Sequence, residues 1–295
     1  MKEKLWEEFT QKLSATRLTN IILSQNGERI YEHHFLEEHC RNIYSATKSF
    51  TSTAVGIALK EGLLSLDEKI TDCFPEEIPE QPSQNLQQLR VEHLLNMSVG
   101  QAEPFLMGEK RPFLKEKDWV RYVLSQPFEH RPGSRFLYSN TGPYLAGILI
   151  SRRAGCSMAD YLQARVFVPL GWHRVTWEVD PLGNTFGAGG LFLTTTELLQ
   201  FGELYLYQGL HHGKQLVPQE WVQRVKRPQI QSEEKQEGYS FLFWNGQHAS
   251  YRASGKYGQY SIVMEDKNAV LAIQAESVRP AEFMDLFWNE VYPNL

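Results

Sequence analysis

The segment IYSATKSFTSTAVG, residues 43–56, opens a predicted helix with a serine and a lysine three positions apart. Positions i and i+3 share one face of a helix, so the Ser45 hydroxyl and the Lys48 amine could meet. The first backbone N–H groups of a helix lack intrahelical partners, and one of them could bind an oxyanion. The segment therefore indicates either a serine nucleophile with its base one turn away or an ordinary capped helix.

The nucleophile hypothesis requires a neutral Lys48. The pKa of a free lysine is about 10.4, so burial or a nearby positive charge must lower the pKa by about 3 for the amine to act as a base. A second Ser-x-x-Lys, Ser232 to Lys235, lies in the hydrophilic run QIQSEEKQEG, and no apolar helix follows it. We interpret the second copy as a chance match on a solvated loop.

A Tyr-x-Asn pattern, Tyr138 to Asn140, precedes another predicted helix. A tyrosine beside a cleft could move protons between nucleophile and leaving group, provided that a nearby ammonium lowers its pKa. Asn140 could hydrogen bond both Lys48 and a substrate amide. The alternative is a half-buried core tyrosine followed by a helix cap. Tyr292-Pro293-Asn294 has the same pattern, so the pattern alone is not specific.

A third segment, RASGKYGQYSIV, residues 252–263, carries Gly255 and Gly258 where a strand is predicted to begin. Glycine in a strand often marks the close approach of another backbone or of a ligand. A backbone N–H of this segment could be a second oxyanion donor. A bulged strand or a tight turn would explain the glycines equally well.

Strand patterns occur at both ends of the chain and helical patterns between them. Asn26-Gly27 predicts a hairpin over residues 19–35, and β-rich runs separated by polar turns begin at residue 238 with GYSFLFW. We expect one α+β domain spanning 1–295: an antiparallel sheet built from both chain ends, terminal helices flanking it, and an all-α insert. The expected α/β part covers about 1–62 and 186–295, the insert covers about 63–185, and a cleft separates the two.

Composition excludes several classes of function. Hydrophobic residues make up 42% and charged residues 22% of the 295 residues, and the net charge is −5. This predicts a globular core and no nucleic-acid or membrane partner. With no apolar leader and no long apolar run, we expect a soluble, cytoplasmic protein.

The cysteines and histidines do not indicate a metal site. Cys40, Cys73 and Cys156 are scattered, which argues against a disulfide framework or a zinc cluster. The adjacent pairs His33-His34 and His211-His212 would point to opposite faces of a strand and would chelate poorly. We therefore expect neither a metal ion nor another cofactor.

In this order, the three motifs resemble those of the serine β-lactamase and penicillin-binding-protein superfamily. The resemblance is strongest to the branch that holds class C β-lactamases, D-Ala-D-Ala carboxypeptidases, β-lactamase-like esterases and 6-aminohexanoate-dimer hydrolases. It covers roughly residues 18–275 and includes LRVEHLLNMSVG and FGAGGLFLTTTELLQFG.

The resemblance implies a hydrolase that forms an acyl-enzyme on Ser45 with a small-molecule or peptide-like substrate. Lys48 would be the general base. Tyr138 would protonate the leaving group and activate the deacylating water, and Asn140 would position substrate and lysine. The oxyanion would lie between the backbone N–H groups of Ser45 and Lys256.

The third motif departs from the family pattern. Penicillin-recognising members carry Lys-Thr-Gly or His-x-Gly there, whereas our preferred register places Ala253-Ser254-Gly255 at this site. A shifted register would place Lys256-Tyr257-Gly258. Without the lysine, we expect cleavage of esters or small amides in preference to β-lactams, unless Arg252 or Lys256 supplies the charge. The alternative function is a low-turnover penicillin- or peptide-binding sensor on the same fold.

Overall fold

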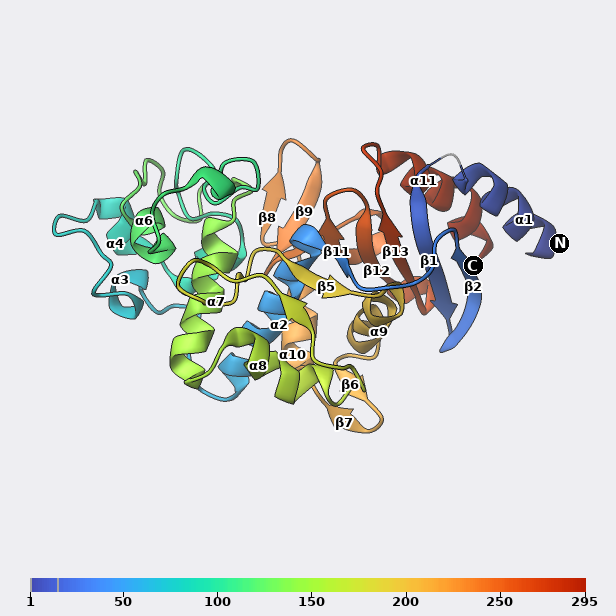
Figure 1. Ribbon diagram of the computed structural model, residues 1–295, viewed down its shortest axis with the longest axis horizontal. Coiled ribbons are helices and arrows are strands. Elements are labelled where there is room, and N and C mark those ends of the chain that lie inside the picture. Colours follow the sequence, from blue (N-terminus) through green and yellow to red (C-terminus); the bar gives the residue numbers. More distant parts are fainter. Residues whose placement is uncertain (1, 15) are drawn as a thin grey trace.

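The computed structural model describes residues 2–14 and 16–295 and has an α+β fold built on an eight-stranded antiparallel sheet (Figure 1). The sheet order is β2-β1-β13-β12-β11-β10-β9-β8. Its strands are β1 (Leu18–Gln25), β2 (Glu28–His34), β8 (Ile230–Ser232), β9 (Glu237–Ser240), β10 (Phe243–Asn245), β11 (Tyr251–Gly255), β12 (Gln259–Met264) and β13 (Ala269–Ala275). Because β1 pairs with β13, both ends of the chain contribute to one sheet, as the sequence predicted.

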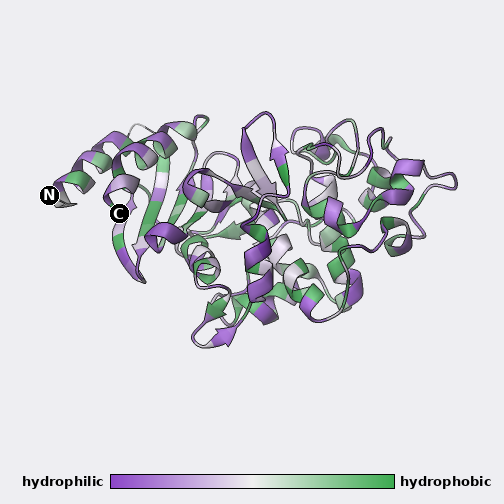
Figure 2. Cartoon of the chain, turned by 180° about the vertical axis from the view of Figure 1, so that it is seen from behind, coloured by the Kyte–Doolittle hydropathy of each residue, from purple (hydrophilic) through white to green (hydrophobic). Residues whose placement is uncertain are grey.

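Helices cover both faces of this sheet. Helix α1 (Lys2–Leu13), helix α11 (Ala281–Leu286) and the π-helical turn Phe287–Val291 pack on one face, where Phe9 and Leu271 share a core. Helix α9 (Thr195–Leu206) packs on the other face, where Phe201 and Val270 are buried together. Alternate residues of β13 therefore enter different cores, because successive strand side chains point to opposite faces. Figure 2 shows the matching mixture of hydrophobic and hydrophilic positions along α1.

Helix α2 (Thr47–Lys60) lies between the helical part and the sheet, in contact with α7 (Thr141–Ala154), α8 (Met158–Leu162) and β11, and is buried on all sides from Thr47 to Ala58. Small and hydroxylated side chains allow this burial, because they permit close packing and their hydroxyls find partners. Thr51 Oγ1 donates to Gly187 O at 2.6 Å, and Ser49 Oγ donates to Leu242 O at 2.9 Å. The other helices of this part of the molecule are α3 (Ile70–Cys73), α4 (Gln84–Gln88), α5 (Val91–Leu95), α6 (Trp119–Leu124) and α10 (Gln219–Val225).

Several short strands had no signal in the sequence. β3 (Arg41–Asn42), β5 (Leu191–Leu193) and β4 (Thr176–Trp177) form a three-stranded sheet, so the helical insert also contributes a strand. β6 (Leu210–His211) and β7 (Lys214–Gln215) form a separate hairpin. Strands of two or three residues are too short to show an alternating pattern.

The run GYSFLFW is two strands and a turn, where we expected one β-rich run. Phe241 and Leu242 form the turn between β9 and β10 with positive φ angles of 44° and 67°. This conformation normally favours glycine or asparagine. Here tertiary contacts hold it: Phe241 N donates to Asn96 Oδ1 at 2.9 Å, and Leu242 N donates to Leu95 O at 2.8 Å.

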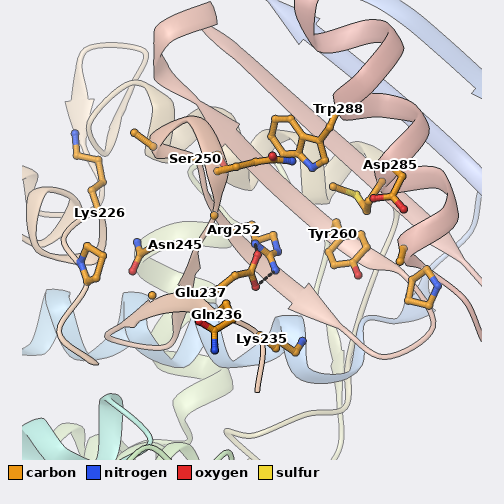
Figure 3. Close-up of a pocket in the computed structure, with 18 residues that line it drawn as sticks. Lys226, Lys235, Gln236, Glu237, Asn245, Ser250, Arg252, Tyr260, Asp285 and Trp288 are labelled. Carbon is orange, nitrogen blue, oxygen red and sulfur yellow. Dashed lines mark hydrogen bonds and ion pairs between the residues drawn. The ribbon is translucent and has the colours of Figure 1, made fainter. Parts of the chain in front are cut away.

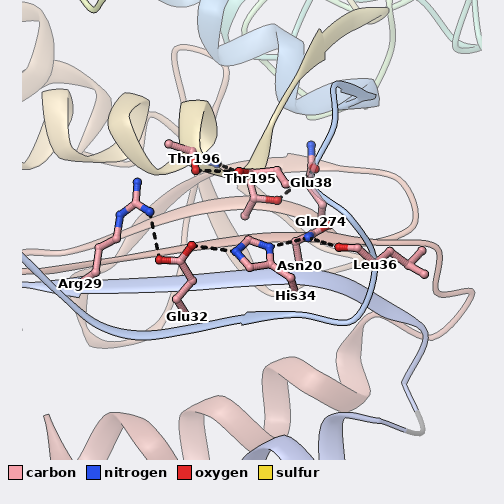
Figure 4. A network of polar contacts seen from close by, with 9 residues as sticks. All are labelled: Asn20, Arg29, Glu32, His34, Leu36, Glu38, Thr195, Thr196 and Gln274. Atoms are coloured by element: carbon pink, nitrogen blue, oxygen red, sulfur yellow. Dashed lines mark hydrogen bonds and ion pairs between the residues drawn. The ribbon is translucent and has the colours of Figure 1, made fainter.

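Polar contacts fasten the segment that leads from β2 to Ser45 (Figure 4). The buried Asn20 Nδ2 donates to His34 Nδ1 at 2.7 Å, and His34 Nε2 lies 2.7 Å from Glu32. An amide nitrogen only donates, so the His34 proton belongs on Nε2. Farther along, Glu38 accepts hydrogen bonds from the backbone N and the hydroxyl of Thr196, at 2.7 and 3.0 Å. The segment is thereby tied to the N-terminus of α9.

Across residues 2–14 and 16–295, none of the helices combines the length and apolar character needed to cross a membrane.

Candidate active site

Ser45 and Lys48 meet at the start of α2, as their spacing predicted. Ser45 lies in a 3₁₀ turn, Tyr44–Ala46, which runs directly into α2. Lys48 Nζ lies 2.9 Å from Ser45 Oγ and donates to the carbonyl oxygen of Ala188 at 2.7 Å. When the amine is neutral, the contact with Ser45 allows it to accept the hydroxyl proton.

The surroundings of Lys48 favour the neutral amine. Its side chain is buried, and burial lowers its pKa well below the ordinary value, with a further contribution from the Arg111 guanidinium. Arg111 is itself held by Glu178 at 2.7 Å and lies over the Phe186 ring at 4.1 Å. The sequence analysis missed Arg111, because nothing local distinguishes this arginine from the others.

Tyr138 lies against the same pair of residues. Its ring centroid is 5.1 Å from Lys48 Nζ, its ring stacks on Trp244 at 5.8 Å, and its hydroxyl hydrogen bonds Ser45. Burial raises the pKa of Tyr138 to about 12, and the Ser45 hydrogen bond offsets only part of this increase. The lowered pKa that the sequence analysis required is therefore not found, because burial dominates the pKa of Tyr138 and Lys48 does not offset it.

Asn140 holds a loop instead of Lys48. Its Nδ2 donates to the carbonyl oxygen of Leu106 at 2.7 Å, and its buried Oδ1 has no partner among the residues that the structure describes. The hydrogen bond with Lys48 that the sequence predicted is not formed: the partners of Lys48 Nζ are Ser45 Oγ and the carbonyl oxygen of Ala188. Asn140 thus positions the loop that carries Met107 to the cavity wall.

Strand β11 passes beside the Ser45 turn and requires glycine there. A Cβ on Gly255 would lie 2.1 Å from Ile43 O and 3.2 Å from Ala46 N. Tyr257 and Gly258, with φ of 67° and 97°, form the turn after the strand. This geometry favours the Ala253-Ser254-Gly255 register, since the glycine of that register makes the close approach.

A cavity of about 580 Å³ opens over Ser45. Of the predicted site residues, Ser45, Tyr138, Ser254, Gly255 and Lys256 line it, whereas Lys48 and Asn140 lie behind its wall. The sequence analysis did not identify the remaining lining residues, which are Met107, Phe136, Ser232, Glu234, Lys235, Trp244, Tyr257, Tyr260, Ser277, Val278 and Pro280.

The two residues expected to supply positive charge differ in position. Lys256 lies in the cavity wall, 3.4 Å from the exposed Glu109. Arg252 instead forms a two-point ion pair with Glu237, at 3.0 and 2.7 Å, and lines a neighbouring cavity of about 880 Å³ (Figure 3). Arg252 therefore does not line the cavity that contains Ser45.

The second Ser-x-x-Lys lies only in part on a solvated loop: residues 233–236 form an exposed turn between β8 and β9, as the sequence interpretation expected, whereas Ser232 is buried. Ser232 is 1% exposed and ends β8, and its Oγ accepts a hydrogen bond from the backbone N of Lys235 at 3.4 Å. The Lys235 side chain extends over the Trp244 ring, with Nζ 4.4 Å from the centroid. Pairing of β8 with β9 buries the serine, which a hydrophilic sequence does not reveal.

Comparisons with known proteins agree with this fold. The sequence model of the family Beta-lactamase matches residues 19–289. Penicillin-binding protein 4* of Bacillus subtilis is 23% identical over 173 residues, covering 52% of this chain and 36% of that protein. The 6-aminohexanoate-dimer hydrolase of Paenarthrobacter ureafaciens is 22% identical over 258 residues, covering 82% of this chain and 65% of that protein.

The fold is also found among solved structures. The structure of EstCE1, a hydrolase with promiscuous acyltransferase activity, superposes with a TM-score of 0.77 at 14% identity, covering 97% of this chain and 98% of that chain. The chain spans about one third and two thirds of the lengths of the two relatives above, so it shares their common domain rather than their full length. By its sequence match over residues 19–289 and by its fold, this chain belongs to the Beta-lactamase family.

Proposed function

We propose that this protein is a serine hydrolase that cleaves an ester or amide bond through an acyl-enzyme on Ser45. One observation carries the proposal: Lys48 Nζ lies 2.9 Å from Ser45 Oγ in a buried position that lowers the pKa of the amine. A neutral amine in hydrogen-bond contact with a hydroxyl is the arrangement that an activated serine requires.

In the proposed first half-reaction, Lys48 accepts the proton of Ser45 while Oγ attacks the substrate carbonyl. The backbone N–H groups of Ser45 and Lys256, at the N-terminus of α2 and the end of β11, would bind the oxyanion. When the tetrahedral intermediate collapses, Tyr138 gives its proton to the leaving group and recovers one from the Lys48 ammonium. In the second half-reaction, water attacks the acyl carbonyl and gives a proton to the same residues, which pass a proton to Ser45 Oγ as its bond to the acyl group breaks.

Ester or small-amide cleavage is proposed over efficient β-lactam hydrolysis. Ala253 is buried in β11, at the position where penicillin-recognising relatives carry a lysine, so that cation is missing. The names of a dimer hydrolase and of a hydrolase with acyltransferase activity among the similar proteins support the same preference.

Labelling with a fluorophosphonate tests the nucleophile. We expect one adduct on Ser45 by mass spectrometry, and none in Ser45→Ala. Equal labelling of both proteins, or of neither, would overturn the proposal.

Paired kinetics test the preference for esters. We expect faster turnover of a short-chain para-nitrophenyl ester than of a chromogenic cephalosporin. Fast cephalosporin hydrolysis with negligible ester hydrolysis would reverse the ranking. A stable acyl adduct that does not turn over would instead identify a sensor.

A further inference from the structure

The cavity over Ser45 and the larger neighbouring cavity share one stretch of wall. Lys235, Tyr260 and Pro280 line both cavities. Figure 3 shows Lys235 and Tyr260 on this wall, with the Glu237 carboxylate turned toward Arg252. A ligand that extends from Ser45 along this wall toward the larger cavity would pass Lys235.

Two aromatic rings connect Lys235 to the candidate reacting groups. Its Nζ lies 4.4 Å from the centroid of the Trp244 ring, and that ring stacks on Tyr138 at 5.8 Å. Tyr138 in turn contacts Lys48 and Ser45. The β8–β9 hairpin therefore delivers an ammonium group to the rim of the cavity over Ser45, with the rings of Trp244 and Tyr138 between it and the candidate base.

The ammonium of Lys235 has no ion-pair partner within residues 2–14 and 16–295. Glu237, two residues along the chain, does not pair with Lys235, because Arg252 donates to both of its carboxylate oxygens. Glu234 lines the same cavity without contacting Lys235 at ion-pair distance. Lys235 is exposed, and an exposed ammonium that rests on an aromatic ring and lacks a paired anion can bind an anion at low desolvation cost.

We propose that Lys235 binds a carboxylate of the substrate and so makes carboxylate-bearing esters or amides the preferred substrates. The inference rests on the proposed function, since it assigns a substrate class to the same site. Lys235 would supply the charge that Ala253 lacks, from a different element of the fold. The carboxylate belongs either to the acyl part or to the leaving group, and the experiment distinguishes these two cases.

Steady-state kinetics with three matched esters test the inference. The neutral reference is para-nitrophenyl butyrate. Mono-para-nitrophenyl glutarate carries the carboxylate on the acyl part, and meta-carboxy-para-nitrophenyl butyrate carries it on the leaving group. We expect Lys235→Met to raise KM roughly tenfold or more for one carboxylate ester and to leave the neutral ester within about twofold. Lys235→Arg should retain most of the preference.

Two further variants sharpen the result. Glu234→Gln removes a negative charge from the cavity wall and should lower KM for the same carboxylate ester. Lys214→Met removes a positive charge from the exposed β6–β7 hairpin, on the opposite side of the molecule in Figure 1, and should change nothing. If Lys235→Met affects all three esters equally, or none, the inference is wrong.

Binding to Ser45→Ala separates this inference from the proposed function. Calorimetry on this variant should show tighter binding of the preferred carboxylate ester than of the neutral ester, and Lys235→Met should abolish the difference. This result supports the carboxylate site even if no ester is turned over. Turnover that depends on Ser45, with equal binding of all three esters, would overturn the carboxylate site alone.

Discussion

Arg111 and Glu178 form a close ion pair behind the candidate base: one guanidinium nitrogen donates to both carboxylate oxygens, at 2.7 and 2.9 Å. Burial, and then the charge of Arg111, lower the pKa of Lys48. The ion pair joins Arg111, in the helical region, to Glu178, which directly follows β4. A change at either residue should therefore alter the protonation of Lys48 on α2.

Charge changes at this pair should move the pH–rate profile in opposite directions. Glu178→Gln leaves Arg111 uncompensated and should shift the acid limb of kcat/KM to lower pH. The double variant Arg111→Met/Glu178→Gln removes the positive charge that lowers the pKa of Lys48. The acid limb of kcat/KM should therefore shift to higher pH, by about half a pH unit. A limb that stays in place in both variants would show that Arg111 does not influence Lys48.

Tyr138→Phe should lower kcat by roughly 10²-fold or more, because it removes the proton donor to the leaving group. Since the pKa of Tyr138 is raised to about 12, we also expect wild-type activity to show no loss from tyrosine ionisation up to about pH 10. Steady-state kinetics over this range check both points. Wild-type activity in Tyr138→Phe would refute the assigned role.

Gly255→Ala should destabilise the fold by about 1–3 kcal/mol and abolish most activity, because the added methyl group would overlap the backbone of the Ser45 turn. Gly108→Ala is a suitable control, since its added Cβ meets no atom within 4 Å. Urea unfolding and ester turnover measure the two effects. Equal stability of both variants would contradict the close approach of β11.

Lys48→Met should stabilise the protein by about 1–2 kcal/mol near neutral pH while abolishing activity. The folded-state pKa of Lys48 is lowered, so the unfolded chain binds this proton more readily than the folded protein does. Wild-type stability should therefore rise as the pH increases from the lowered pKa toward about 10.4, where an unfolded lysine titrates. The advantage of Lys48→Met should shrink over the same range. Urea unfolding at several pH values measures the difference, and a constant difference would contradict the prediction.

Local patterns predicted a large part of this structure. The Asn26-Gly27 hairpin, the Ser45–Lys48 contact and the sheet built from both chain ends were confirmed, because turn chemistry and helical spacing act within a few residues. The family resemblance was confirmed by the match over residues 19–289.

The features that local patterns did not predict depend on distant parts of the chain. Phe241 and Leu242 adopt their turn because Leu95, at the end of α5, and Asn96, which follows it, accept hydrogen bonds from their backbone N–H groups. Lys235 reaches the catalytic cavity because β8 pairs with β9, and the pKa of Tyr138 follows from burial rather than from its neighbours in sequence.

The pairing of β1 with β13 sets the order in which the site can form during synthesis. Leu18 lies opposite Ala275, so β1 cannot pair in the central sheet until β13 has left the ribosome. The same delay applies to Gly255, which must reach the Ser45 turn made much earlier. Contacts between such distant segments slow folding, because loop-closure entropy must be overcome first. Ser45 and Lys48 therefore leave the ribosome long before β11, which completes the surroundings of the Ser45 turn.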